Sequence, residues 1–388
     1  MSTSAVREIV RRRRKEYLKG TKSEKERILD EAEELTSYRR KSLVRLFLKG
    51  FQARKAPIRR PREAKYTLVL GHLKTLWAAD LYACGKRLRP FLPELLSVMK
   101  RCGEITVTPV EEALLLSMSA ATMDRKLAIE RKSMAIKGRT LTKPGTLLRS
   151  RIPVQTFAER NDSEPGFLEM DLVGHCGGSG SGEFIYTLDV TDVYSGWIAL
   201  GGTKGRGERG TLLAIEFASK YIPFPIKGIH SDNDGAFINY HLERYCTRKN
   251  MELTRGREYK KNDQCHVEQK NWSVVRQFIG YRRFETDEQL SVLRQVYPLI
   301  TTYHNFFWPM MRLIEKKREG SKVTKRYAAA VTPYRRLIES NGHIDHATKE
   351  RLRQEYESLN PADLLRRIRV LLGRLESLSN PTGKSRGR

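Results

Sequence analysis

The middle of the chain, from about residue 167 onward, consists of short apolar runs divided by polar and glycine-rich stretches. Short apolar runs bounded by turn residues predict strands, whereas apolar residues recurring every three to four positions predict helices. Three strands are expected first, over Phe167–Val173, Phe184–Val190 and Gly196–Leu200. A glycine- and serine-rich loop, residues 177–182, connects the first two strands.

The pattern then alternates between helix and strand. The expected elements are a helix over Gly210–Lys220, a strand over Pro225–His230, a helix over Ile238–Lys249, a strand over Met251–Thr254 and a helix over Val267–Ile279. A hairpin meander that runs into alternating helices and strands predicts an α/β core, with a mixed five-stranded sheet and helices on its faces.

The first 60 residues carry apolar positions at helical spacing. Thr21 and Glu24 form a capping box that opens a helix through about Leu35. Ser37 is expected to cap a second helix that begins at Tyr38. Two short helices with a basic start to the second favour a helix-turn-helix, whose basic residues would face the major groove. An ordinary helical hairpin with solvated charges is equally compatible. The basic residues are Arg39, Arg40 and Lys41.

A similar pattern of helices recurs after a basic, proline-marked stretch. Thr108 and Pro109 predict a helix start before the apolar run Val110–Met118. A turn over Ser119–Thr122 and a helix over Met123–Leu127 would complete a second helix-turn-helix-like unit. The basic residues of its second helix are Arg125 and Lys126.

Beyond the α/β core the chain is basic and is expected to be mainly helical. Residues 316–326 are dense in lysine and arginine, and leucines recur at helical spacing over residues 347–378. The predicted domains are residues 1–60 (helix-turn-helix, DNA-binding), 61–135 (second helical, DNA-binding), 136–160 (basic linker), 161–300 (catalytic core) and 301–388 (basic, mainly helical, with a disordered tail).

The net charge of the chain indicates its binding partners rather than its fold. The 388 residues include 73 lysines and arginines, for a formal net charge of +28. A polyanion is the natural partner, because each neutralised phosphate releases counterions. A merely basic soluble protein is less favoured, since the charge is clustered. Five widely separated cysteines predict neither disulfides nor a zinc finger. With no long apolar run, we expect no membrane contact and a cytoplasmic, nucleoid-associated protein.

Three carboxylates in the core region carry the candidate chemistry. Asp171 lies in the first expected strand, Asp232 follows the fourth, and Glu268 opens the last helix. Sixty residues separate the two aspartates, and 35 separate Asp232 from Glu268. Clustered carboxylates repel one another unless cations neutralise them. Two Mg²⁺ ions, which Mn²⁺ can replace, would resolve that repulsion. They would also activate a water or 3′-hydroxyl for in-line displacement.

This spacing resembles the D,D-35-E triad of the retroviral-integrase catalytic core. The surrounding residues, Glu-Met-Asp171, His-Ser-Asp232-Asn and His-Val-Glu268-Gln-Lys-Asn-Trp, resemble those of bacterial insertion-sequence transposases with that core. The resemblance implies a ribonuclease-H-like fold, catalysis by two metal ions, and DNA strand transfer by 3′-hydroxyl attack. It also implies two double-stranded DNA partners, the terminal inverted repeats of an element and the target DNA. A homo-oligomer that is at least a dimer would bind them.

The expected fold class is therefore multidomain. An all-α helix-turn-helix region precedes an α/β ribonuclease-H-like core, and a basic helical region follows it. Asp234 and Ala236 depart from the usual motif, in which glycine and glutamate stand at those positions. The departure leaves open whether the turn after Asp232 keeps its geometry.

Other residues near the three carboxylates have competing interpretations. Asp189 and Asp192 are expected to be strand-end and turn residues rather than metal ligands. Phosphate contacts are expected from basic residues around Glu268, with a solvated basic face as the competing interpretation. Those residues are Lys260, Lys261, Lys270 and Arg276. The aromatic residues expected in the core are Trp197, Trp272 and Phe278.

Three functions fit the sequence. A DNA transposase is favoured. A catalytically inactive DNA-binding derivative is disfavoured by the complete set of three carboxylates. A nuclease of the same fold that does not join DNA is disfavoured by the two helix-turn-helix patterns, because simple nucleases rarely need to recognise specific ends.

Overall fold

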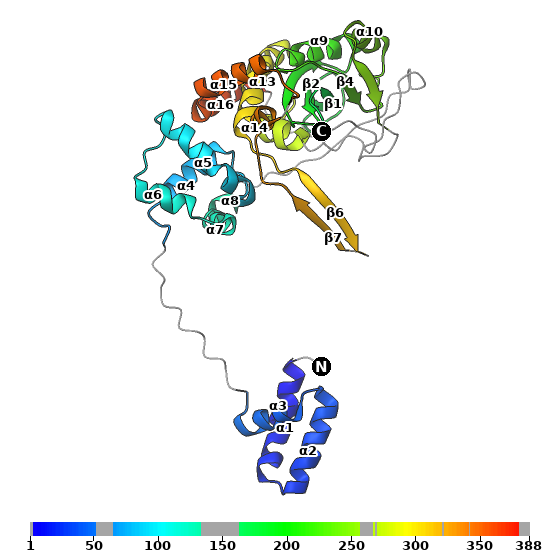
Figure 1. The fold of residues 1–388 in the computed structure, drawn as a ribbon. Coiled ribbons are helices and arrows are strands. Elements are labelled where there is room, and N and C mark those ends of the chain that lie inside the picture. The colour runs from blue at the N-terminus through cyan, green and yellow to red at the C-terminus, as the bar shows by residue number, and fades with distance from the viewer. Residues whose placement is uncertain are drawn as a thin grey trace, which may run out of the picture. The chain divides into compact units, whose positions relative to one another are not determined.

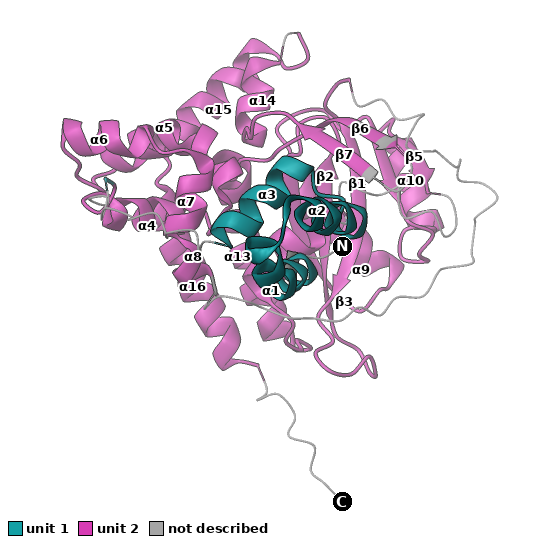
Figure 2. Ribbon diagram, turned by 90° about the horizontal axis from the view of Figure 1, so that it is seen from below, with its two compact units in different colours: residues 1–65 teal, residues 66–388 magenta. Residues whose placement is uncertain are grey.

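A computed structural model describes residues 3–51, 65–132, 163–256, 267, 270–319, 322–340 and 342–379. Its contacts divide the chain into two compact units, residues 1–65 and 66–388 (Figure 2). The expected basic linker, 136–160, and the expected disordered tail lie outside the described residues. The domain boundaries read from the sequence remain predictions.

The described part of the first unit is helical. Its helices are α1 (Thr3–Lys19), α2 (Lys22–Thr36) and α3 (Arg40–Lys49). The capping box at Thr21 is confirmed, since its hydroxyl accepts from Glu24 N and the Glu24 carboxylate accepts from Thr21 N. The rings of Tyr17 and Phe47 stack with centroids 4.7 Å apart. They close a small core made of Val6, Val10, Tyr17, Ile28, Leu29, Ala32, Leu43 and Phe47.

The start of α3 differs from the prediction. Ser37 adopts a left-handed conformation, φ 58°, and its N–H donates to Glu33 O at 2.9 Å. It therefore ends α2 instead of capping the next helix, and Arg39 precedes α3 without a side-chain cap. The basic run at residues 11–15 lies within α1, a helix that the charge density hid from sequence reasoning.

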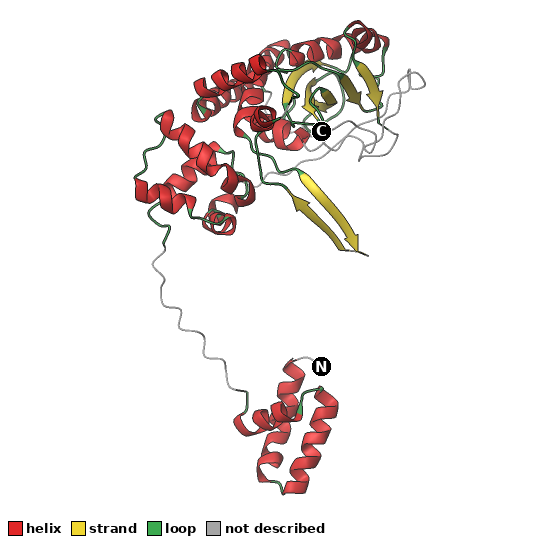
Figure 3. Cartoon of the chain, in the orientation of Figure 1, coloured by secondary structure: helices red, strands yellow, loops and turns green. Residues whose placement is uncertain are grey.

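Helices also dominate the start of the second unit (Figure 3). Thr108 and Glu111 form a capping box at the start of α6. Ser119 caps α7 directly, so the turn expected over Ser119–Thr122 is wrong beyond its first residue. The helices are α4 (Leu70–Ala79), α5 (Gly85–Arg101), α6 (Pro109–Leu116), α7 (Ala120–Lys126) and α8 (Ala128–Lys132).

A five-stranded sheet with the order β3-β2-β1-β4-β5 forms the α/β part of this unit (Figure 1). The first three strands pair antiparallel, and β4 and β5 continue the sheet in parallel with β1. The predicted mixed sheet is confirmed. Its strands are β1 (Phe167–Gly174), β2 (Ile185–Asp192), β3 (Ile198–Lys204), β4 (Gly228–Ser231) and β5 (Glu252–Arg255).

Helices cover both faces of the sheet. A Cβ atom on Gly201 would lie 2.5 Å from Ala214 O in α9 (Glu208–Ser219). A Cβ atom on Gly202 would lie 2.9 Å from the ring of Tyr297 in α13 (Asp287–Phe307). Successive strand residues point to opposite faces, so α9 and α13 pack on opposite sides of β3. The adjacent glycines let both helices approach closely. Helix α10 (Tyr240–Arg248) connects β4 to β5.

The C-terminal region is only partly as expected. Leu313–Glu319 and Lys322–Tyr327 form an antiparallel two-stranded ribbon, β6 and β7, so the expected helix through residues 316–326 is wrong. The leucine spacing beyond it is confirmed as helical. The helices are α14 (Pro333–Glu339), α15 (His346–Ser358) and α16 (Pro361–Ser377). Among the described helices, none is both long and apolar enough to cross a membrane.

Candidate active site

Two of the three predicted carboxylates lie at the same edge of the sheet. The parallel strands β1 and β4 end their pairing at Met170 and Ser231. Asp171 and Asp232 are the next residues along the two strands, and both are half-buried. Adjacent strands lie roughly 4.8 Å apart, so the register brings the backbones of the two aspartates side by side. We call the end of these two strands, at Asp171 and Asp232, the acidic edge. The partial exposure of the two side chains leaves it open to a ligand.

Glu268 lies outside the described residues, but the residue before it is fixed against β1. Val267 donates its backbone N–H to Glu169 Oε2 at 2.9 Å. Glu169 is fully buried on β1, two positions before Asp171. Sequence reasoning did not single out Glu169 as a site residue. The available signal was a glutamate between the apolar residues Leu168 and Met170 of a strand, because such a carboxylate needs a partner when it is buried.

Asn271 also links this segment to the acidic edge. Its Nδ2 donates to Asp171 Oδ2 at 2.5 Å. Its Oδ1 is buried, with no hydrogen-bond partner in the described part of the chain. Asn271 begins a π-helical segment, η3 (Asn271–Arg276), which α12 (Gln277–Ile279) continues. Wide turns of this kind occur frequently at functional sites, and the sequence pattern predicted only an ordinary helix.

Burial and one cation set the electrostatics of Asp232. Burial raises the pKa of Asp232 to about 6, while the nearby Arg206 guanidinium acts in the opposite direction. Arg206 lies between β3 and α9 and forms an ion pair with the buried Asp234. No spacing rule predicts Arg206 at this place, since 27 residues separate it from Asp234.

Asp234 belongs to the turn that follows Asp232. Its N–H donates to Asp232 Oδ1 at 3.0 Å, and its own Oδ1 accepts from Ala236 N at 2.9 Å. Its backbone does not adopt the positive φ that would favour glycine. The departure from the usual motif is therefore accommodated without backbone strain. Asn233 fixes the other side of the turn, because its Nδ2 donates to Gly256 O at 2.9 Å.

On the other side of β1, a buried aspartate of β2 lies beside Asp171. The β1–β2 register pairs Asp171 with Asp189, which is fully buried in the middle of β2 rather than at a strand end. Burial raises the pKa of Asp189 to about 8, Lys270 opposes that shift, and the Asp171 charge adds to it. Asp192 serves the β2–β3 turn as expected. Its carboxylate accepts from Gly166 N and from Ser195 N, at 2.8 and 2.7 Å.

Two of the expected phosphate contacts, Lys270 and Arg276, make contacts within the fold. Lys270 is 5% exposed, and its Nζ lies 3.0 Å from His304 Nε2. Burial lowers its pKa well below the usual value. Arg276 donates to Gly174 O at 2.8 Å and lies over the Tyr281 ring. The Lys270 ammonium is therefore too buried for a phosphate contact, whereas Arg276 is half-buried and its contact with DNA stays a prediction. Lys260 and Lys261 lie outside the described residues.

The basic residues expected to read DNA in the helical regions differ in their surroundings. Arg39 and Lys41 are exposed, whereas Arg40 forms an ion pair with Asp30. Arg125 is exposed and donates to Thr122 Oγ1 at 3.2 Å, and Lys126 is half-buried. Arg39 and Lys41 are therefore accessible at the start of α3, and Arg125 is accessible in the last turn of α7. Their contact with DNA stays a prediction.

The aromatic residues near the site were predicted only in part. Trp197 is buried, and its Nε1 donates to Tyr221 O at 2.9 Å. Phe278 is partly buried against the core. Trp272 is 59% exposed, so its expected place in the core is wrong. It follows Asn271 in the π-helical segment, where the widened turn changes the face that each residue presents.

The described residues suit part of a magnesium site. Mg²⁺ prefers hard oxygen ligands, and this edge offers the carboxylates of Asp171 and Asp232 and the unpaired amide oxygen of Asn271. Within the described ranges no three histidine, cysteine or acidic side chains form a group that could hold a metal ion. The expected third ligand, Glu268, is outside those ranges.

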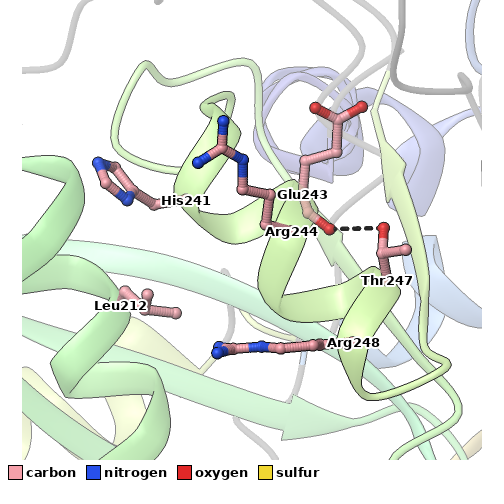
Figure 4. A pocket seen from close by; sticks show the side chains of 6 residues that line it. All are labelled: Leu212, His241, Glu243, Arg244, Thr247 and Arg248. Carbon is pink, nitrogen blue, oxygen red and sulfur yellow. Dashed lines mark hydrogen bonds between the residues drawn. The ribbon is translucent and has the colours of Figure 1, made fainter.

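A separate pocket of about 580 Å³ lies by α9 and α10 (Figure 4). Thr247 Oγ1 donates to Glu243 O at 2.9 Å within α10. None of the predicted site residues lines this pocket, so it is not the acidic edge. Its lining residues are Leu212, His241, Glu243, Arg244, Thr247 and Arg248.

The sheet order and the acidic edge define the class of this protein. A mixed five-stranded sheet with helices on both faces, and aspartates where β1 and β4 meet, fits a ribonuclease-H-like core. No protein-family model matches the chain. The chain is 36% identical over 338 residues to the uncharacterized protein y4rM of Sinorhizobium fredii, covering 86% of this chain and 94% of that protein. It belongs to the same family as y4rM.

Weak likenesses to solved structures were also found. The HTLV-2 integrase catalytic core domain, solved in complex with magnesium in a dimeric form, is 15% identical with a TM-score of 0.30, over 39% of this chain and 93% of that one. The catalytic core domain of BIV integrase is 16% identical with a TM-score of 0.29, over 44% and 91%. The assignment of the fold rests on the sheet order.

Proposed function

We propose that this chain is a DDE-type polynucleotidyl transferase, a DNA transposase that binds the terminal repeats of an element, cuts a DNA strand and joins its 3′-hydroxyl to target DNA. The observation that carries the proposal is the adjacency of Asp171 and Asp232, with the residue before Glu268 tied to Glu169 on the same strand. The sequence motifs around these residues and the charge of +28 support DNA as the substrate.

The side chains have distinct roles in this proposal. Asp171, Asp232 and Glu268 would hold two Mg²⁺ ions, and Mn²⁺ is expected to substitute. Bound there, the ions would supply activation of the attacking hydroxyl and charge stabilisation at the leaving oxygen. Asn271 fixes the Asp171 carboxylate through its 2.5 Å hydrogen bond. Glu169 positions the backbone just before Glu268.

Arg206 and Asp234 shape the loop that carries Asp232. Half-buried Arg206 forms an ion pair with buried Asp234, and Asp234 N donates to Asp232 Oδ1, so Arg206 is linked to Asp232 through Asp234. A fixed Asp232 carboxylate favours catalysis, because charged groups that are already in position stabilise the transition state without reorganising during the reaction. Joining two element ends requires at least two copies of the chain on DNA.

An assay for joined products tests the proposal. The full chain is incubated with Mg²⁺, a labelled oligonucleotide from the DNA that flanks its gene, and a plasmid, beside Glu268→Gln. Joined products from the unmodified chain alone are expected. Asp345→Asn is a matched control, because it also exchanges an acid for an amide and asparagine remains a good helix cap. Cleavage without joining would indicate a nuclease, and binding without chemistry an inactive derivative.

A further inference from the structure

The ribbon formed by β6 and β7 extends from the second unit as a two-stranded arm (Figures 1 and 3). Isolated two-stranded ribbons are marginally stable in water. This one nevertheless exposes large apolar side chains, which water disfavours. The exposed residues and fractions are Leu313 46%, Ile314 60%, Val323 43% and Tyr327 45%.

The ribbon is also strongly basic. Its two strands contain six lysines and arginines and two glutamates. The described side chains of Lys317, Lys325 and Arg326 are exposed. Lys317 has Glu315 as a near neighbour, with Nζ and Oε1 3.2 Å apart. Apolar and basic residues alternate on this exposed ribbon. They suit a partner that is a polyanion and also presents apolar groups on its surface.

The base of the ribbon is fixed next to the acidic edge. Met310 and Val331 exchange backbone hydrogen bonds of 2.9 and 3.1 Å, and Arg336 Nη2 donates to Met310 O at 2.6 Å. The sulfur of Met310 contacts the Lys270 ammonium, and Lys270 directly precedes Asn271. A partner bound by the ribbon would therefore lie at a fixed position relative to Asn271, which donates to Asp171.

The strand register separates the two faces by charge. Glu315 pairs with Arg326 and Glu319 with Lys322, so both acidic residues share one face. Val323, Lys325 and Tyr327 alternate along the other, acid-free face. That face is the one suited to approach a negatively charged surface.

We propose that the β6–β7 ribbon enters the major groove of duplex DNA and aligns the duplex with the acidic edge. A two-stranded ribbon fits the major groove, roughly 12 Å wide, but not an undeformed minor groove of roughly 6 Å. Val323 and Tyr327 would contact apolar groups on the base edges, such as thymine methyls, and Lys325, on the same face, would contact a phosphate. The inference rests on the proposed function only in taking DNA as the substrate.

Salt-dependent binding tests the phosphate contacts. The full chain binds a labelled duplex in buffer without divalent cations, so no strand is processed, and anisotropy is measured over a range of NaCl concentrations. Lys325→Gln should lower the slope of log K against log salt by about 0.9, the change expected for one lost phosphate contact. The control is Arg369→Gln, an equal loss of exposed charge on α16. Its slope should match that of the unmodified chain.

Dimethyl sulfate protection identifies the groove, because guanine N7 lies in the major groove. Protection of N7 by the unmodified chain, lost in Val323→Ser with Tyr327→Ser, is expected. The proposal would be overturned by any of three results. These are equal salt slopes for the unmodified chain and the ribbon variant, an equal change of slope in the control variant, and unchanged N7 protection in the Val323→Ser and Tyr327→Ser variant. So would dissociation of a DNA-free oligomer by the Val323→Ser and Tyr327→Ser changes, which would make a second copy the partner. Loss of joining with a normal ribbon slope effect would overturn only the proposed function.

Discussion

At the scale of single residues, the proposed metal ligand Asp232 lies in an environment that disfavours its charged form. Burial raises its pKa to about 6, from 3.8 in an unfolded chain. Between those values the folded state holds a proton that the unfolded state has released. The free energy of unfolding therefore falls as pH rises from about 4 to about 6, and the penalty is complete above that range.

Asp232→Asn should consequently stabilise the cation-free protein at pH 7, by on the order of 1 kcal/mol, while abolishing joining. Urea unfolding at pH 4 and pH 7 measures the effect, which should be present only at the higher pH. Added Mg²⁺ should raise the melting temperature of the unmodified chain more than that of the variant, since binding stabilises the folded state. An equal Mg²⁺ response of the two proteins would exclude Asp232 as a ligand.

Glu169 makes a second prediction at this scale. Glu169→Ala leaves the buried Val267 N–H without its partner, which should cost about 1–3 kcal/mol of stability. It should also raise the Mg²⁺ concentration needed for half-maximal joining, because Glu268 loses its anchor. Glu169→Gln keeps an acceptor and should recover most of both properties. A variant that loses stability but keeps the Mg²⁺ requirement would show that Glu169 has a structural role alone.

The three carboxylates could be proposed from the sequence because their spacing and flanking motifs can be recognised without knowledge of the fold. Their supporting residues could not. Glu169, Arg206 and Asn271 act through contacts between residues 28 to 100 positions apart in the chain, as in Asn271 with Asp171 and Arg206 with Asp234. Burial likewise moved Lys270 from an expected DNA contact to an interior partner of His304.

At the scale of elements, α13 is tied to the edge of the sheet by one buried side chain. Asn305 Nδ2 donates to Ile198 O, and Asn305 Oδ1 accepts from Ile198 N, both at 2.8 Å. This pair of bonds substitutes for a neighbouring strand at the edge strand β3, whose backbone groups would otherwise be unsatisfied.

Asn305→Ala should lower the free energy of unfolding by about 3 kcal/mol, because two buried backbone groups lose their partner. Urea denaturation measures this loss. Gln295→Ala, which removes an exposed amide from the same helix, should change stability by less than about 0.5 kcal/mol. Similar losses for the two variants would mean that the Ile198 hydrogen bonds do not hold α13.

The elements with a clear apolar period were predicted, and those governed by charge were not. Strands β1 to β5 followed from apolar runs between turn residues. The β6–β7 ribbon was mistaken for a helix because lysine and arginine dominate residues 316–326 and mask the alternation of Val323 and Tyr327. The π-helical segment that begins at Asn271 has no signature in the sequence pattern.

At the scale of the whole molecule, the two compact units have separate cores. The apolar side chains of the first unit, such as Val6, Leu43 and Phe47, form a cluster distinct from that of residues 66–388. Each cluster is closed within its own unit, which predicts that the second unit does not need the first in order to fold.

A chain that lacks residues 1–65 should keep the melting temperature of the second unit and bind duplex DNA without preference for the element ends. Calorimetry and competition binding with flanking and random duplexes measure the two properties. The expected loss of preference arises because base-reading helices specify a site, whereas phosphate contacts act on any duplex. An unchanged preference would place end recognition in residues 66–388.

The central claim is that Asp171, Asp232 and Glu268 act as one site. The most direct measurement is the rate of strand joining with Mg²⁺ for Asp171→Asn, Asp232→Asn, Glu268→Gln and the triple variant, beside Asp345→Asn. Each single change should reduce the rate at least about 1,000-fold, as expected when several kcal/mol of charge stabilisation is lost. The triple variant should be no slower than the singles, because residues that act as a unit are not additive. Appreciable joining by any single variant, or additive losses in the triple variant, would contradict the account.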